Sequence, residues 1–185
     1  MILLYKGKSF VSWRIRMATL SEYSHQAWLK TTQTLRDMIR IAPNSEEVKK
    51  LIIDAGCIEA WEGVGVRETY SLKAGHTPGT QIDVYDLPGL DEFKFKIIED
   101  YMRQQVGKPY WYRGILYARF NLFRGKEPPT DAEGHISTYF CSMLGEDALR
   151  FVDWPTVDLR CPIHGVWPGK TADSIMTKYL CTVTI

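Results

Sequence analysis

The residues of this sequence that could carry covalent chemistry are its cysteines. It has four, at Cys57, Cys141, Cys161 and Cys181. A free cysteine is most often a small buried hydrophobe, so its surroundings must mark a reactive one. A glycine-containing loop and two aromatic residues precede Cys141, and a run that predicts a helix follows it. The amino end of a helix stabilises a thiolate, and its N–H groups can hold the oxyanion of a tetrahedral intermediate.

A nucleophilic thiol needs a base, and the base needs a group that orients it. His25 falls on a predicted strand, whereas His76 lies in a turn-like segment that predicts a solvated side chain. His135 lies in the loop just before Cys141 and is the local rival, and His164 follows a proline. The position of His25 favours it as the base, although a lone strand histidine is more often a satisfied core residue.

Glu59 is the candidate for the orienting group. It lies on a predicted strand next to that of His25, between Ile58 and Ala60. A carboxylate beside a histidine on an adjacent strand would fix the ring tautomer and stabilise the imidazolium. An exposed strand glutamate is the plain alternative.

The elements that must position these residues are mostly strands first and then mostly helices. Strands are predicted in "ILLYK", "YSHQAWLK", "GCIEAWEG", "VGVRETYSL" and "GTQIDVYDLP", while "SFVSWRIRMATL" has an ambiguous period. Helices are predicted over 31–40, 45–54 and 90–106, in "YWYRGILYARFNLF", from Cys141 to about Phe151, and in "TADSIMTKYL". This order predicts an α+β fold with an antiparallel sheet and helices packed on one side.

The length and composition predict a single domain over residues 1–185. The net charge of +1 gives no basic field for nucleic acid. The apolar start of the chain is too short for a signal peptide, and no run is long enough for an integral membrane segment. We therefore expect a protein that is cytoplasmic as synthesised, and the sequence leaves its oligomeric state open.

Four segments in this order resemble the circularly permuted NlpC-like peptidases, the branch of papain-like cysteine hydrolases that includes YiiX-type proteins. These are "YSHQAWL", "GCIEAWEGVGV", "VGKPYWYRGIL" and "YFCSML", and the resemblance extends over roughly residues 3 to 175. It implies a papain-like core in which the sheet precedes the nucleophile at the start of a helix. It also implies Cys141 as nucleophile, His25 as base and Glu59 as orienting residue.

The sequence departs from the family pattern in two places. Met143 stands where the family often has a glutamate after Cys-Ser. Residues 31–54 hold two helical patterns between His25 and Glu59, where the family has a tight connection, and we interpret them as an insertion that serves as a lid or a partner surface. Of the three assignments, that of Glu59 depends most on this insertion leaving the strands in place.

Further residues are expected to contact substrate. These are Tyr5, whose phenol could donate to the oxyanion, Ser24, Tyr110, Tyr112 and Tyr139. We predict no metal, because Cys161 and His164 form at most half of a zinc site without a second pair. We also predict no cofactor, because no phosphate loop or dinucleotide motif is present.

The sequence thus predicts a cysteine hydrolase that cleaves an amide bond through an acyl-enzyme. The resemblance suggests a peptide or isopeptide such as those of cell-wall peptides, a peptidoglycan-like substrate. Two alternatives remain. One is a lipid-directed acyltransferase or amide or thioester hydrolase, and the other is a non-catalytic binding protein that retains the fold.

Overall fold

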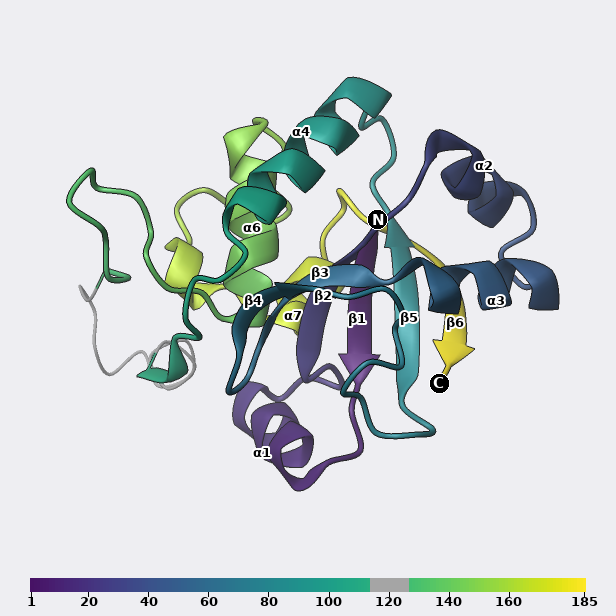
Figure 1. The fold of residues 1–185 in the computed structure, drawn as a ribbon, viewed down its shortest axis with the longest axis horizontal. Helices are drawn as coiled ribbons and strands as arrows, with labels where there is room; N and C mark the ends of the chain where they lie inside the picture. The colour runs from purple at the N-terminus through teal and green to yellow at the C-terminus, as the bar shows by residue number, and fades with distance from the viewer. Residues whose placement is uncertain (114–126) are drawn as a thin grey trace.

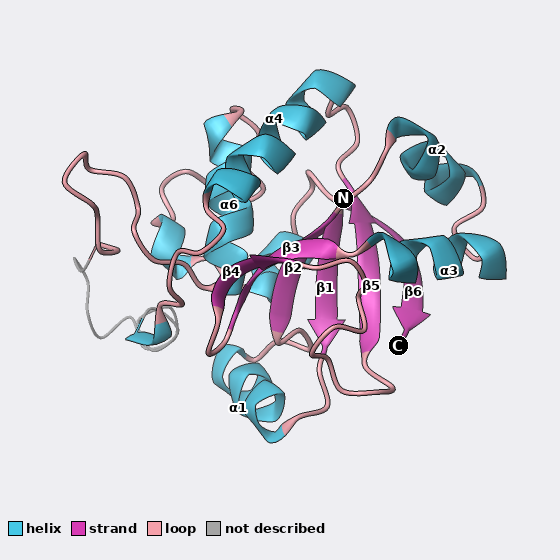
Figure 2. Ribbon diagram, in the orientation of Figure 1, coloured by secondary structure: helices cyan, strands magenta, loops and turns pink. Residues whose placement is uncertain are grey.

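A six-stranded antiparallel sheet forms the centre of the molecule, with the strand order β4-β3-β2-β1-β5-β6 (Figures 1 and 2). The computed structural model describes residues 1–113 and 127–185. The strands are β1 (Ile2–Lys6), β2 (His25–Leu29), β3 (Cys57–Trp61), β4 (Gly65–Glu68), β5 (Gln81–Asp86) and β6 (Lys178–Thr184). The first five confirm the strands predicted from alternating and β-branched sequence.

The helices lie on both faces and at one end of this sheet. They are α1 (Phe10–Thr19), α2 (Gln33–Ile41), α3 (Glu46–Ala55), α4 (Glu92–Gln104), α6 (Cys141–Phe151) and α7 (Pro168–Ala172), with a 3₁₀ turn at Ile163–Gly165. In Figure 1, α4 and α6 pack together, α2 and α3 lie on the other side, and α1 lies below the strand ends. The expectation that helices cover one side only is therefore wrong.

Strand β1 shows why both faces must be covered. All its apolar side chains are buried, and successive residues of a strand point to opposite faces. Ile2 and Leu4 join a core with α4 and α6, whereas Leu3 and Tyr5 join a second core with α2 and α3. Burial on both faces is the physical reason that "ILLYK" has a continuous apolar run rather than an alternating one.

Residues 31–54, interpreted above as an insertion, form α2 and α3 and supply one side of the second core. Ile39, Val48 and Ile52 are buried there against Leu3 and Leu29. Ser45 is the residue that precedes α3. The segment therefore packs on the sheet with its apolar side, which is a structural role that a lid would not require.

The helix predicted over residues 171–180 is wrong at its carboxyl end. The short helix α7 begins earlier, at Pro168, and Lys178–Thr184 pairs with β5 as an edge strand. In β6, Cys181 and Val183 are buried, and this alternation was obscured by the polar residues before it. The ambiguous segment near the amino terminus is helix α1, which Ser9 caps with its side chain. The helix expected in "YWYRGILYARFNLF" lies largely outside the described residues.

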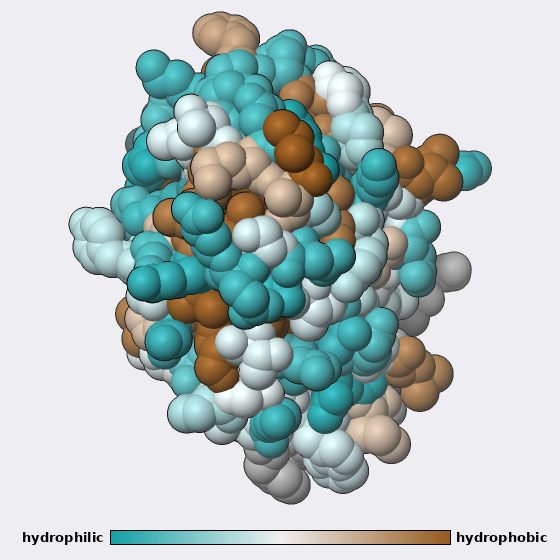
Figure 3. Space-filling model, turned by 90° about the vertical axis from the view of Figure 1, so that its right-hand side faces the viewer, coloured by the Kyte–Doolittle hydropathy of each residue, from teal (hydrophilic) through white to brown (hydrophobic). Residues whose placement is uncertain are grey.

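Within the described parts of the chain, no helix combines the length and the apolar character needed to cross a bilayer. On the face seen in Figure 3, apolar side chains stand in separate groups among hydrophilic ones. Scattered exposed apolar residues of this kind are normal for a protein surface.

Candidate active site

The thiol of Cys141 lies at the first residue of α6, as the sequence predicted. Phe140 precedes the helix in an extended conformation and has no side-chain cap, so the amino end of α6 lacks a capping oxygen from that residue. Burial alone would raise the pKa of Cys141, but the charge of His25, a hydrogen bond with its ring and the backbone N–H groups of Gln26 and Ser142 lower it. This is the environment of a stabilised thiolate.

His25 begins β2 and pairs in register with Tyr5 of β1. Its Nε2 lies 2.6 Å from Oε2 of Glu59, which leaves Nδ1 as the ring atom available to Cys141. Burial alone would lower the pKa of His25, but the charges and hydrogen bonds of Cys141 and Glu59 outweigh it and raise that pKa to about 10. The imidazolium and thiolate forms are thus stabilised together.

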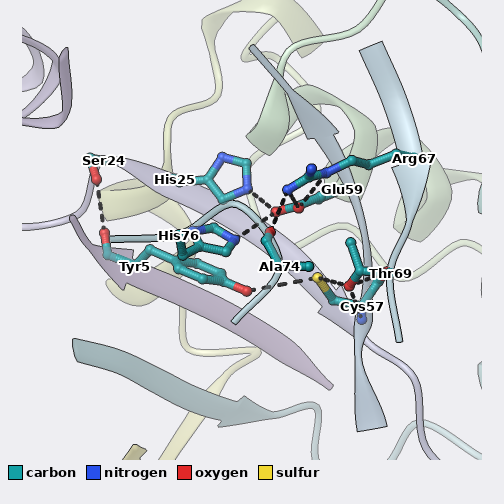
Figure 4. A network of polar contacts seen from close by, with 9 residues as sticks. All are labelled: Tyr5, Ser24, His25, Cys57, Glu59, Arg67, Thr69, Ala74 and His76. Carbon is teal, nitrogen blue, oxygen red and sulfur yellow. Dashed lines mark hydrogen bonds and ion pairs between the residues drawn. The ribbon is translucent and has the colours of Figure 1, made fainter. Parts of the chain in front are cut away.

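The carboxylate of Glu59 is fully buried, and several nitrogen atoms that can donate hydrogen bonds surround it (Figure 4). Its Oε2 faces His25, and its Oε1 accepts hydrogen bonds from Nε and Nη2 of Arg67 at 2.9 and 2.6 Å. Arg67 is the residue opposite Glu59 in the β3–β4 pair. Burial alone would raise the pKa of Glu59, but the hydrogen bond with His25 and the close approach of both His25 and His76 hold it well below its usual range.

A divergence between β2 and β3 makes room for the thiol. The two strands pair only at Trp28↔Ile58 and Leu29↔Cys57, so β3 has separated from β2 before Gln26 is reached. The backbone N–H of Gln26 forms a hydrogen bond with Cys141 instead. The sheet therefore contributes a main-chain donor to the site as well as His25.

A cleft of about 160 Å³ opens beside His25. Its lining residues are Tyr5, Gly7, Ser9, Ser12, Ile15, Ser24, His25, Trp61, Glu62, His76 and Tyr110. Polar and aromatic side chains are mixed, and the carboxylate of Glu62 is exposed at the rim. Such a mixture suits a substrate with polar backbone groups.

His76 is the site residue that sequence reasoning missed. It was expected to be solvated, but its side chain is only 6% exposed and its Nε2 lies 3.4 Å from Oε2 of Glu59. Its ring stacks on Tyr5 with centroids 4.3 Å apart, and Trp61 packs edge-on against it at 4.5 Å. The glycines and proline around His76 correctly indicate a turn, and nothing in the local sequence shows that this turn folds over Glu59.

The other histidines lie away from this cluster. The side chain of His135 is 75% exposed and faces Asp131. His164 is buried and packs edge-on against Trp111. Within the residues that the structure describes, the group of potential metal ligands is His25, Glu59 and His76, and the half-site at Cys161 and His164 is not part of such a group.

The residues expected to contact substrate differ in their position relative to the cleft. Tyr110 lines the cleft, and burial and then the charge of Cys141 raise its pKa well above the usual range. Tyr112 is half-exposed and packs edge-on against Tyr110. Tyr5 presents its ring to the cleft, but its hydroxyl is directed to the thiol of Cys57 at 3.7 Å rather than to Cys141.

Ser24 and Tyr139 have structural contacts. The hydroxyl of Ser24 accepts a hydrogen bond from Gly7 and donates one to the carbonyl of Tyr5, so it braces β1 against β2 at the cleft wall. Tyr139 is buried, and its hydroxyl donates to Asp147 at 2.7 Å on α6. That hydroxyl is engaged on the helix rather than in the cleft, so the expected contact of Tyr139 with substrate is not supported.

Comparison with known proteins shows that the fold of this chain is similar to that of a solved structure. No protein-family model matches the sequence, and no curated protein matches it. A solved structure, described as metalloprotein yiiX from Escherichia coli O157:H7, DUF1105, is 14% identical with a TM-score of 0.58. The match covers 100% of this chain and 96% of that one. The α+β sheet and helices described above are thus consistent with the YiiX fold, the protein type that the sequence resembles.

Proposed function

We propose that this protein is a cysteine hydrolase of the permuted papain-like type, with Cys141 as nucleophile, His25 as base and Glu59 as orienting residue. One observation carries the proposal. The thiol at the amino end of α6 forms a hydrogen bond with a histidine whose other ring nitrogen is bound to a buried carboxylate. This is the arrangement of nucleophile, base and orienting group that activates a thiol.

In the proposed reaction, the Cys141 thiolate attacks the carbonyl carbon of an amide, and the backbone N–H of Cys141 donates to the resulting oxyanion. The tetrahedral intermediate collapses when His25 gives its proton to the departing amine, which leaves an acyl group on sulfur. His25 then removes a proton from water, whose oxygen attacks the thioester. The carboxylic acid leaves and the thiolate–imidazolium pair is restored. Glu59 stabilises the imidazolium at each stage.

The cleft favours a peptide over a lipid as substrate. Hydroxyls of Ser9 and Ser12 and the carboxylate of Glu62 line it beside the aromatic rings, whereas a site for an acyl chain would be apolar throughout. The resemblance to cell-wall peptidases points to a peptide or isopeptide. A lipid-directed hydrolase on the same fold would instead be revealed by turnover of a lipid amide and none of a peptide amide.

The test is alkylation of Cys141 by iodoacetamide as a function of pH, in buffer with EDTA, with the modified residue identified by mass spectrometry. In the wild type, the rate should rise at a lower pH than for an ordinary thiol, because the charge of His25 and the hydrogen bond with its ring lower the pKa of Cys141. In His25→Ala, the thiol loses its charged partner and remains buried, so its pKa should rise to about 8.5 or above.

A dependence of Cys141 alkylation on pH that was the same in the wild type and in His25→Ala would exclude the proposed ion pair. A Cys141→Ser variant that kept full amidase activity would exclude the nucleophile.

A further inference from the structure

We propose that His25, Glu59 and His76 form a binding site for one divalent transition-metal ion of the zinc class. The three side chains offer two imidazole nitrogens and one carboxylate oxygen, all within 4.8 Å of one another. Zinc sites with an open coordination position use two histidines and one glutamate in this way. The inference does not depend on the proposed hydrolase activity.

His76 is the residue that points to a ligand. Its side chain is 94% buried, from the 6% exposed fraction, and its Nε2 has no hydrogen-bond partner among the described residues. That nitrogen faces Oε2 of Glu59 at 3.4 Å, which is too long and too poorly aligned for a normal hydrogen bond. An unpartnered buried nitrogen destabilises the folded protein, and binding an ion would satisfy it.

The same 3.4 Å separation suits two ligands of one metal ion. With zinc–nitrogen and zinc–oxygen bonds near 2.1 Å and tetrahedral angles, neighbouring ligand atoms lie roughly 3.4 Å apart. His25 and Glu59 are closer, at 2.6 Å, because a proton now joins them. An ion would replace that proton on Nε2 of His25 and move the two atoms apart by less than about 1 Å.

The surroundings fix the ligands without using their binding atoms (Figure 4). Arg67 binds Oε1 of Glu59 and also donates to the carbonyl of Ala74, so the loop that carries His76 is fastened to the carboxylate. Oε2 is left for the two imidazoles. The ring of Tyr5 supports His76 from one face. Contacts of this kind are what orient metal ligands in proteins.

The cleft provides access to the site and a position for a further ligand. His25 and His76 both line it, so a water or a substrate atom could complete the coordination from that side. The guanidinium of Arg67 is the charged group on the opposite side of Glu59, and it will reduce the affinity for a cation without blocking Oε2.

The experiment is calorimetric titration of the full chain with zinc chloride at pH 7.5, after treatment with EDTA and its removal. The parent is Cys141→Ser, which has no thiol at the site and no hydrolase activity to confuse the result. We expect one zinc ion per chain. His76→Gln in this parent should weaken binding at least tenfold, whereas His135→Gln, a change at an exposed histidine, should leave it unchanged.

Long-range proton–nitrogen spectra of the imidazoles give a second measurement without a change at His76. On addition of zinc to the Cys141→Ser parent, the Nε2 signals of His25 and His76 should both shift. The proposal is overturned if the parent binds no zinc, if His76→Gln binds as tightly as the parent, or if binding is seen in the wild type and lost in the parent. Binding in the wild type but not in the Cys141→Ser parent would show that the sulfur of Cys141 is a ligand of the ion.

Discussion

At the scale of single residues, the network around Glu59 concentrates much of the electrostatics of the site on one fully buried carboxylate. One oxygen faces His25 and the other is held by Arg67. Arg67 also stacks on Trp61, with 4.2 Å between its guanidinium carbon and the ring centroid. A buried ion pair whose partner is removed leaves an uncompensated charge, which costs far more than a surface pair contributes.

We predict that Arg67→Ala lowers the free energy of unfolding by about 2 kcal/mol or more at pH 7. The folded-state pKa of Glu59 lies below its unfolded value near 4.3, so the stability that its charge supplies is present above that value and is lost as the pH falls below it. Because His25 and His76 hold that pKa down, the carboxylate stays charged in both proteins, and the difference between wild type and variant should be similar at pH 7 and pH 5. Urea denaturation at the two pH values measures it.

Arg160→Ala is the matched control for this prediction. Arg160 also pairs with a carboxylate, that of Asp158, but its side chain is 91% exposed, so its loss should leave the stability nearly unchanged. A cost for Arg67→Ala no larger than that for Arg160→Ala would contradict the prediction.

The sequence predicted the residues whose surroundings along the chain are distinctive. Cys141 directly precedes a strong helical pattern, and His25 and Glu59 lie on predicted strands, but it is the family resemblance that joins the three into one predicted site. His76 and the hydroxyls of Tyr5 and Tyr139 could not be placed. Their contacts, with Glu59, Cys57 and Asp147 respectively, depend on how loops and helices fold over the sheet.

At the scale of elements, the close approach of α6 to β2 sets the position of the thiol. Gly145 of α6 lies over β2, and a Cβ atom at that position would lie 2.4 Å from Nε2 of Gln26. The side chain of Gln26 cannot easily move away, since it is buried and its Oε1 accepts a hydrogen bond from Thr171 at 3.0 Å. The helix can therefore pack this closely only because residue 145 has no side chain.

We predict that Gly145→Ala destabilises the wild type by about 1–3 kcal/mol, through overpacking against Gln26. In a Gln26→Ala background the obstacle is gone. The same substitution should there be neutral, or stabilising by up to about 1 kcal/mol, because alanine is the better helix former. Urea denaturation of the two single variants and the double variant measures this coupling. Equal effects of Gly145→Ala in both backgrounds would contradict the packing argument.

Element prediction succeeded where periodicity was strong and failed at polar, short elements. The helix predicted over 90–106 corresponds to α4 at Glu92–Gln104, and α6 has the predicted bounds. Strand β6 was missed because it is an edge strand with only one well-buried face, which gives few apolar positions. Its pairing with β5 is a long-range contact that the local sequence does not determine.

At the scale of the whole molecule, one sheet with a core on each face leads us to predict that the described parts of the chain unfold as a single cooperative unit. Residues 31–54 are the critical part, because an appended insertion could unfold on its own. Instead, Ile52 of α3 is fully buried in the second core together with Leu3 and Leu29 of the central strands. Side chains that share a core should unfold together.

We predict that Ile52→Ala lowers the free energy of unfolding by about 2–5 kcal/mol, as other truncations in cores do. Leu51→Ala on the same helix should cost much less, because Leu51 is 39% exposed. In Ile52→Ala, tryptophan fluorescence and far-ultraviolet circular dichroism should report one shared urea transition. A separate early loss of helical signal would show that α2 and α3 form an independent unit.

The two walls of the cleft differ in how firmly they are held, and this difference affects how a substrate enters. Tyr5, His25 and Glu59 stand on three adjacent strands with packed layers on either side, which leaves their backbones little room to fluctuate. The opposite wall includes Ser12 and Ile15 of α1, a helix that lies at the strand ends rather than against a face of the sheet (Figure 1). We therefore expect the width of the cleft to fluctuate through movement of α1 relative to the strands. The reactive groups on the strands would keep their alignment while the entrance widens.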